Sequence, residues 1–422
     1  MISAVLFVSF FVFLILGIPI GICLGLSSIC AILYSGTSLT IVATNMYSGI
    51  SKFLLLAIPF FVLSGNIMAK AGISKRLIRF VDTCVGHTRG GIAIVCVIVA
   101  CFFGAISGSG PATVAALGMV LIPAMIERGG FSAPFSTALM ATSSSIAIVI
   151  PPSIAFVVYA SITGVSIADM FTAGIVPGIL MGVALVIVVM LEARKNNIQP
   201  TQKKASGKER WDAFKDAFWG FLMPVIILGG IYSGMLTATE SAAIAVVWAA
   251  IAGLFIYKEL TVKELVPILK DSAKSSAMIL FIIAASTAFS WVFTFSGASQ
   301  ALVNAVISMH LNSALFCFVV AIILLIFGTF MEGTAIAVLL VPVLWPIAQS
   351  MGIDVIHFGM IVCISNVVGT MTPPVAVNIF SASTVSGLKM GDIAKAEIPF
   401  LIGYVAVFFC CVFSETFCTF LI

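Results

Sequence analysis

Long apolar runs, separated by short polar segments, cover most of the chain. Parsed by their length and by their polar interruptions, these runs predict helices that cross a membrane. The predicted helices lie near 4–20, 22–36, 53–69, 91–106, 112–126, 133–163, 169–190, 217–235, 240–257, 275–294, 312–329, 334–350, 357–386 and 396–420. We therefore expect an all-α polytopic membrane protein. Its first helix should be a retained membrane helix, since Met1-Ile2-Ser3-Ala4 lacks the positive charge of a signal peptide.

Two polar segments divide the chain further. The segment 191–216 is the most polar part, and we predict that it is a cytoplasmic linker between two halves, 1–190 and 217–422. The segment 258–274 places Lys residues between apolar positions, a pattern typical of an amphipathic helix on a membrane surface. We therefore expect a surface arm helix in the second half.

Composition agrees with a membrane protein. Hydrophobic residues make up 61% of the 422 positions and charged residues 9%, whereas soluble domains carry roughly 25% charged residues. Lipid must therefore cover most of the surface. The net charge of +4 is too small to indicate a nucleic-acid partner. The ten Cys residues have no metal or redox spacing, and His87, His310 and His357 lie far apart, so we expect no metal site of that kind.

The basic residues indicate which side of the membrane each loop faces. With the N-terminus placed outside, the polar loops that fall on the cytoplasmic side are 70–89, 127–132, 191–216, 258–274 and 387–395. They hold 19 of the 20 Lys and Arg residues, and only Lys52 falls elsewhere. Because cytoplasmic loops are enriched in Lys and Arg, this distribution predicts that both termini face outward.

The two halves resemble each other at a fixed spacing. Pro151-Pro152 and Pro373-Pro374 are 222 residues apart, as are Ser143 and Ser365. In the topology above, the first proline pair lies in a helix that runs outward and the second in a helix that runs inward. We therefore predict two inverted repeats. Inverted repeats with interrupted helices are typical of secondary transporters, whose sites lie near the membrane midplane.

Each proline pair breaks a predicted helix, at 133–163 and at 357–386. Proline lacks an amide hydrogen and clashes with the carbonyl four residues earlier, so four carbonyls should be released: those of Ala147, Ile148, Gly369 and Thr370. Irregular backbone survives at membrane depth only where it is buried in protein or lines a cavity. Further oxygen ligands suited to Na⁺ lie nearby: Thr142, Ser143, Ser144, Ser145, Ser365, Asn366 and Thr372. The alternative is two simple proline kinks, which the symmetric placement disfavours.

Two short helix pairs, 91–126 and 312–350, are predicted to be re-entrant hairpins. The runs of the first pair reach roughly 24 Å, which is short of the ~30 Å hydrocarbon core. Its tip, 107–111, is rich in Gly and Ser, and the counterpart tip is 330–334. The helix that begins near Thr113 would point an electropositive N-terminus at the midplane, where it can hold a carboxylate.

Charge at membrane depth constrains the mechanism. Glu332 can ligate Na⁺, carry a proton or cap the helix that follows it, and Glu240 fits a cap at the membrane interface. All Lys and Arg residues are assigned to loops or surface helices. An anionic substrate must therefore be held by hydroxyls, helix N-termini and bound cations, which makes cation coupling a physical need.

The sequence resembles the large membrane subunit of TRAP (tripartite ATP-independent periplasmic) transporters, DctM-like members of the ion transporter superfamily. The motifs that carry the resemblance span nearly the whole chain: Gly104-Ala105-Ile106-Ser107-Gly108-Ser109-Gly110-Pro111-Ala112-Thr113-Val114-Ala115-Ala116-Leu117-Gly118, Ile150-Pro151-Pro152-Ser153 with Tyr159, Pro224-Val225-Ile226-Ile227-Leu228-Gly229-Gly230 with Thr239-Glu240, and Thr372-Pro373-Pro374.

The resemblance implies Na⁺-coupled uptake of a carboxylate, such as a C4-dicarboxylate or sialic acid, across a bacterial inner membrane. It also implies an elevator mechanism, a small four-helix membrane partner and a periplasmic substrate-binding protein. In such a membrane, the two termini predicted above to face outward are periplasmic. By this likeness, one Na⁺ site maps to 107–109 with 145–150 and another to 331–334 with 369–372. The Na⁺ ligands we infer are Ser107, Gly108, Ser109, Ser145, Ala147, Ile148, Glu332, Gly333, Gly369, Thr370 and Thr372. The substrate-binding residues we infer are Ser107, Ser109, Thr113, Ser145, Asn366 and Thr334.

Three other functions remain open at this point. A free-standing Na⁺- or H⁺-coupled carboxylate carrier would work without a binding protein. An intramembrane hydrolase would use Ser107 or Ser109, but it needs a general base nearby, and no His lies in a predicted midplane segment. A channel is disfavoured by the paired hairpins. We therefore expect a secondary transporter and not an enzyme, with Na⁺ as coupling ion and no organic cofactor.

Overall fold

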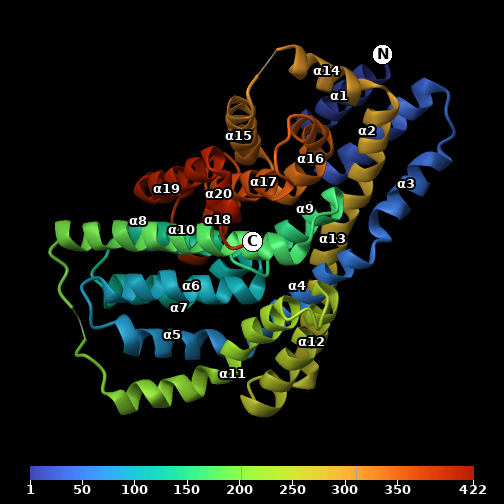
Figure 1. Ribbon diagram of the computed structural model, residues 1–422. Coiled ribbons are helices and arrows are strands. Elements are labelled where there is room, and N and C mark those ends of the chain that lie inside the picture. The colour runs from blue at the N-terminus through green and yellow to red at the C-terminus, as the bar shows by residue number, and fades with distance from the viewer. Residues whose placement is uncertain (201, 310) are drawn as a thin grey trace.

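The computed structural model describes residues 1–200, 202–309 and 311–422, and the regular elements in these ranges are helices (Figure 1). His310 lies outside the described residues. The first half contains α1 (Ile2–Ile15), α2 (Ile20–Ser35), α3 (Thr40–Ile50), α4 (Ala57–Lys70), α5 (Ile73–Val85), α6 (Gly91–Ser107), α7 (Gly110–Glu127), α8 (Ala133–Ser145), α9 (Ile154–Thr163) and α10 (Ile167–Lys195). The second half contains α11 (Gly207–Tyr232), α12 (Ala238–Ile251), α13 (Val262–Phe295), α14 (Ala298–Ser308), α15 (Ser313–Phe330), α16 (Gly333–Ser350), α17 (Val355–Gly369), α18 (Val377–Ser386), α19 (Met390–Phe413) and α20 (Glu415–Thr419).

The predicted fold class is confirmed. Within the described ranges, nine helices are long and apolar enough to cross a membrane, and shorter apolar helices accompany them. Helix ends match the predicted runs at both hairpins, where α6 is followed by α7 and α15 by α16. The two breaks also lie where the proline pairs predict them, between α8 and α9 and between α17 and α18. The inverted symmetry and the depth of the hairpins in a membrane remain predictions.

Helices from the two halves of the chain are interleaved. In Figure 1, α13 runs along one side of the molecule, and it packs on α2, α3, α4 and α16. A second group surrounds α8, which contacts α6 and α7 from its own half and α18 and α19 from the other half. The second hairpin packs beside this group, since α15 and α16 both contact α17, and α16 also contacts α9. Helix α4 packs on α6 of the first hairpin, and α13 packs on α16 of the second.

Three details of the helix prediction are wrong. Residues 262–274 of the predicted arm continue without a break into the run 275–294 as one helix, α13, because no Gly or Pro lies between Lys270 and Ser275; Pro267 is accommodated within the helix. A separate surface arm helix is therefore absent there. The linker is shorter than 191–216, since α10 extends to Lys195 and α11 begins at Gly207. Helices α3 and α14 were not predicted, because both are only 11 residues long and interrupted by polar residues. Helix α5 was not predicted either, because it lies in the basic segment 70–89, whose charges indicate a loop.

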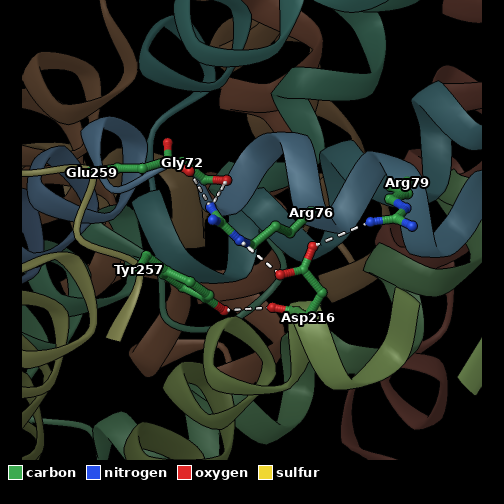
Figure 2. Close-up of polar contacts among 6 residues, drawn as sticks. All are labelled: Gly72, Arg76, Arg79, Asp216, Tyr257 and Glu259. Atoms are coloured by element: carbon green, nitrogen blue, oxygen red, sulfur yellow. Dashed lines mark hydrogen bonds and ion pairs between the residues drawn. The ribbon is translucent and has the colours of Figure 1, made fainter. Parts of the chain in front are cut away.

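A charged cluster joins α5 to α11 and to the turn before α13 (Figure 2). The Arg76 guanidinium donates to Asp216 (3.1 Å) and to Glu259 (2.6 Å) and lies 4.0 Å from the centre of the Tyr257 ring. The Tyr257 hydroxyl donates to the Asp216 carbonyl (3.0 Å), and burial raises the pKa of Tyr257 to about 12. These contacts fasten the start of α5, which leads into the first hairpin, to the neighbouring helices.

We expect Arg76→Ala to lower the free energy of unfolding by about 1–2 kcal/mol, because it removes two partly exposed ion pairs and the cation–π contact. The thermal midpoint of the purified protein in detergent measures the loss. Lys215→Ala is the control, since it breaks an exposed pair with Asp212 (3.5 Å) and a longer cation–π contact with Trp211 (5.6 Å). It should change stability by less than about 0.5 kcal/mol. Equal losses in the two variants would contradict a special role for Arg76.

Candidate functional site

The tip of the first hairpin is a Gly-Ser turn whose hydroxyls bond to one another. The turn consists of Gly108 and Ser109, and Gly108 has φ +60°, a conformation that favours glycine. The Ser107 and Thr113 hydroxyls lie 2.9 Å apart, and the Thr113 hydroxyl donates to the Ser109 carbonyl (2.9 Å). Thr113 is fully buried. It braces the turn from within, and its predicted role in substrate binding stays a prediction.

The tip of the second hairpin is built around Glu332, which precedes α16. Its carboxylate accepts from the backbone N–H groups of Thr334 (3.0 Å) and Ala335 (3.3 Å) and from the Thr334 hydroxyl (2.8 Å). The capping role left open by the sequence is therefore present. Gly333 packs so closely on the Asn366 side chain that a Cβ there would lie 1.6 Å from the Asn366 Cγ, so any larger residue at this position must displace the Asn366 amide.

The first break lies inside the protein. Pro151, Pro152 and Ser145 are buried, and the α6 backbone approaches so closely that a Cβ on Gly104 would lie 2.8 Å from the Ala147 Cα. The Ile148 carbonyl, expected to be free, accepts from the Ser153 hydroxyl (2.5 Å). One lone pair of that carbonyl remains, because a carbonyl oxygen has two.

The carbonyls of the second break have backbone partners. The Gly369 carbonyl accepts from the Thr372 N–H (3.0 Å), and the Thr370 carbonyl accepts from the Asn378 N–H (3.1 Å). The expectation that both are unpaired is therefore wrong, although each keeps one lone pair for a cation. The Thr370 and Thr372 hydroxyls donate to carbonyls of α17, at 2.8 Å each. Unlike the first proline pair, Pro373 and Pro374 are exposed in the chain taken alone.

The two breaks meet at α8. The Ser145 hydroxyl lies 3.0 Å from the Met371 sulfur and 2.7 Å from the Thr142 carbonyl. Asn378 connects the same regions, because its side-chain amide donates to the Ala141 carbonyl (3.4 Å) and lies against the Gly110 backbone at the start of α7. Residues of one break therefore support those of the other.

A cavity of about 700 Å³ adjoins both hairpin tips. Ser107, Ser109 and Glu332 line it, together with Pro111 and Ala112 of the first turn of α7. Helices α2, α4 and α13 form the opposite wall, and no Lys or Arg is found among the described lining residues. The cavity can therefore offer hydroxyls, a helix N-terminus and one carboxylate, but no basic side chain.

The other predicted site residues lie behind this cavity. Ser145, Asn366 and Thr334 are buried near the breaks and do not line it. The structure therefore separates two groups of predicted residues. One group lines the cavity at the hairpin tips. The other, which we call the buried oxygen set, lies at or beside the breaks and includes Ala147, Ile148, Gly333, Gly369, Thr370 and Thr372. Which of these residues bind an ion or a substrate remains a prediction.

Four polar residues near the site were not singled out in the sequence. Asn66 of α4 lines the cavity, and Asn378 joins the breaks. Glu397 and Tyr404 of α19 contact the end of α8. The signal available for Glu397 was an acid inside an apolar run, which marks a functional candidate. Tyr and Asn in apolar runs are too common to stand out without the packing.

These features define a multi-pass helical membrane protein with a solute-sized cavity between its helices. Residues 7–416 match the family model described as tripartite ATP-independent periplasmic transporter, DctM component. The chain belongs to this family of transporter permeases, so the resemblance stated from its motifs is confirmed and the hydrolase alternative is excluded.

Named relatives cover most of the chain. The C4-dicarboxylate TRAP transporter large permease protein DctM of Pseudomonas aeruginosa is 41% identical, over 90% of this chain and 88% of that protein. The sialic acid TRAP transporter large permease protein SiaM of Vibrio cholerae is 33% identical, over 92% of this chain and 90% of that protein. Among solved structures, the Alcanivorax borkumensis YdaH transporter has a similar fold, with a TM-score of 0.62, 15% identity, and coverage of 88% of this chain and 86% of that one.

Proposed function

We propose that the chain is the large membrane subunit of a Na⁺-coupled importer of small organic anions. The observation that carries this proposal is a cavity that both hairpin tips line and that has no basic residue among its described lining residues. An anion in such a cavity needs compensation from helix N-termini and a bound cation. The carboxylate substrates named for the relatives fit this chemistry.

The transport step we propose is an elevator movement. The two hairpins and the two broken helices would move together against α4 and α13. The cavity lies between these two groups, so its contents would be exposed to one side of the membrane and then to the other. In this proposal Na⁺ binds at the buried oxygen set, and the substrate binds at the tips.

The proposed partners are a small membrane subunit and a periplasmic binding protein that delivers the substrate. The isethionate TRAP transporter permease protein DctMQ of Oleidesulfovibrio alaskensis supports the first, since this chain aligns to 64% of its length at 38% identity and leaves room for a fused subunit. The bacterial inner membrane is the proposed location, with both termini periplasmic.

Uptake into proteoliposomes that contain the chain and its small subunit tests the proposal. We expect uptake of a labelled C4-dicarboxylate or of sialic acid to require an inward Na⁺ gradient and periplasmic extract containing the binding protein. Ser145→Ala and Thr370→Ala should each raise the Na⁺ concentration for half-maximal uptake roughly threefold to tenfold, the effect of one lost ligand or hydrogen bond.

Ser28→Ala is the control, because Ser28 is a buried serine of α2 that bonds only within its own helix (2.7 Å). Its half-maximal Na⁺ concentration should equal that of the wild type. Uptake that persists unchanged without Na⁺ would refute the coupling, and uptake without periplasmic extract would favour the free-standing carrier. Unchanged Na⁺ dependence in both variants would remove Ser145 and Thr370 from the ion sites.

A further inference from the structure

One face of α19 lies along α8, the helix that ends at the first break. Glu397, Phe400 and Tyr404 are spaced by three and four residues, which places them on the same side of α19. All three are buried, and the Phe400 ring lies 5.1 Å from that of Phe135 in α8. The polar members of this face, Glu397 and Tyr404, both meet Thr142.

Tyr404 completes the end of α8. The last carbonyls of a helix have no partner within it. Here the Thr142 carbonyl, in the last turn of α8, accepts from the Tyr404 hydroxyl (2.8 Å) and from the Ser145 hydroxyl (2.7 Å). The two lone pairs of that carbonyl are thereby matched by two donors, one of which comes from a different helix.

Glu397 meets the side chain of the same residue. Its Oε1 lies 3.0 Å from the Thr142 hydroxyl oxygen, and the residue is only 2% exposed. Within the described part of the chain, no Lys or Arg pairs with Glu397, and its Oε2 has no hydrogen-bond partner. The Thr142 hydroxyl also lies 2.8 Å from the Ala138 carbonyl of its own helix. Two side chains of α19 therefore contact Thr142, one at its carbonyl and one at its hydroxyl.

The Ser145 hydroxyl has two acceptors within reach, the Thr142 carbonyl (2.7 Å) and the Met371 sulfur (3.0 Å), and the carbonyl is the stronger of the two. A hydroxyl has one hydrogen and two lone pairs. When the hydrogen of Ser145 points at the Thr142 carbonyl, the lone pairs face away from α8. A cation at the first break requires such lone pairs. The position of the Thr142 carbonyl therefore decides whether Ser145 can serve as a ligand.

We propose that Tyr404 and Glu397 are positioning residues for a Na⁺ ion at the first break, acting through Thr142 on Ser145. This inference rests on the proposed function, since it assumes that Na⁺ binds there. Neither residue touches the ion. They fix the end of the α8 half-helix, which presents the ligand.

The test measures Na⁺ binding without transport, on the chain purified in detergent with its small membrane subunit. The readout is the NaCl concentration that gives half of the maximal rise in the thermal unfolding midpoint, with choline chloride holding the ionic strength constant. We expect Tyr404→Phe and Glu397→Leu each to raise this concentration roughly threefold to tenfold. Glu397→Gln should stay within about twofold of the wild type, because the amide has the same size and can make the same contact.

Tyr159→Phe is the matched control. Tyr159 is also fully buried, and its hydroxyl donates to a backbone carbonyl of another helix, that of Val355 (2.7 Å). This variant should lower the unfolding midpoint without Na⁺ as much as Tyr404→Phe does, but leave the half-saturating Na⁺ concentration unchanged.

The inference is overturned if Tyr404→Phe matches the wild type in half-saturating Na⁺ while Ser145→Ala raises it. It is also overturned if Tyr159→Phe shifts the Na⁺ concentration equally. A wild-type protein whose midpoint does not respond to Na⁺ would refute the proposed function itself. Tyr404→Phe removes a single oxygen, so it serves as the decisive variant if Glu397→Leu does not fold.

Discussion

A single methyl group at Gly369 is expected to reduce Na⁺-driven uptake at least tenfold. Gly369 is the last residue of α17, where the second break begins. A Cβ at this position would lie 2.7 Å from the Gly328 Cα and 3.0 Å from the Gly328 carbonyl oxygen. These are backbone atoms of α15, so no side chain can turn aside to make room. The two helices must separate, and the Gly369 carbonyl must move with them.

The expected cost has two parts. Overpacking of a tightly packed interior destabilises proteins by about 1–3 kcal/mol, which should appear as a lower thermal midpoint. The Gly369 carbonyl would also move away from the other oxygen atoms of the second break, which should raise the Na⁺ concentration needed for uptake. Proteoliposome uptake over a range of Na⁺ concentrations, together with the thermal midpoint, separates the two effects for Gly369→Ala.

Gly391→Ala is the matched control, because Gly391 also lies in a helix and a Cβ there meets no atom within 4 Å. It should leave uptake unchanged. Gly369→Ala with wild-type uptake and midpoint would show that α15 and α17 can separate freely at the break. The role of that carbonyl in transport would then be excluded.

The same close approach recurs in the first half, where a Cβ on Gly104 would lie 2.8 Å from the Ala147 Cα. Gly104 and Gly328 are the last-turn glycines of the first helix in each hairpin, and Ala147 and Gly369 stand at the two breaks. Ala147 and Gly369 are 222 residues apart, which is the same spacing as that between the two proline pairs. In each half, a hairpin thus packs directly on the backbone of its own broken helix, as the predicted repeats require.

Local rules explain what the sequence predicted correctly. Helices followed from runs of apolar residues, because only internally paired backbone is stable in lipid. The breaks followed from Pro151-Pro152 and Pro373-Pro374, since proline cannot continue the hydrogen-bond ladder. The first tip followed from Gly108 and Ser109, residues suited to a tight turn. Each of these features depends on residues close together in the chain.

Features that depend on packing between distant segments could not be predicted. The Thr370 carbonyl finds the Asn378 N–H because the chain folds back after the second break. Thr142 meets Glu397 and Tyr404 because one particular face of α19 lies on α8. Every face of these helices is apolar enough to be buried, so the hydrophobic pattern does not choose among them. The continuity of α13 was missed for a local reason. Its Lys residues indicated that a surface helix ends near residue 274, but no helix-breaking residue lies at that point.

The second large effect is expected at Glu332, where removal of the negative charge should raise the half-saturating Na⁺ concentration tenfold or more. The carboxylate caps α16 with three hydrogen bonds and also lines the cavity beside Pro111 and Ala112. A carboxylate has about four lone-pair sites, so one remains for a cation. An anionic substrate in the same cavity would be repelled by Glu332 unless a cation lay between them.

Substitution by Asn separates capping from charge, because Asn caps helices about as well as Asp does. If Glu332 acts only as a cap, Glu332→Asn keeps both stability and Na⁺ dependence. If its charge binds the coupling ion, we expect Glu332→Asn to keep the wild-type thermal midpoint in the absence of Na⁺. The free energy of Na⁺ binding should then fall by about 1.5–3 kcal/mol, the range for hydrogen bonds to charged groups. That loss corresponds to roughly a tenfold to hundredfold rise in half-saturating Na⁺. Glu332→Asp restores the charge on a shorter side chain and should recover much of the Na⁺ affinity. If Glu332→Asn shows the wild-type Na⁺ dependence, helix capping is the only role of Glu332.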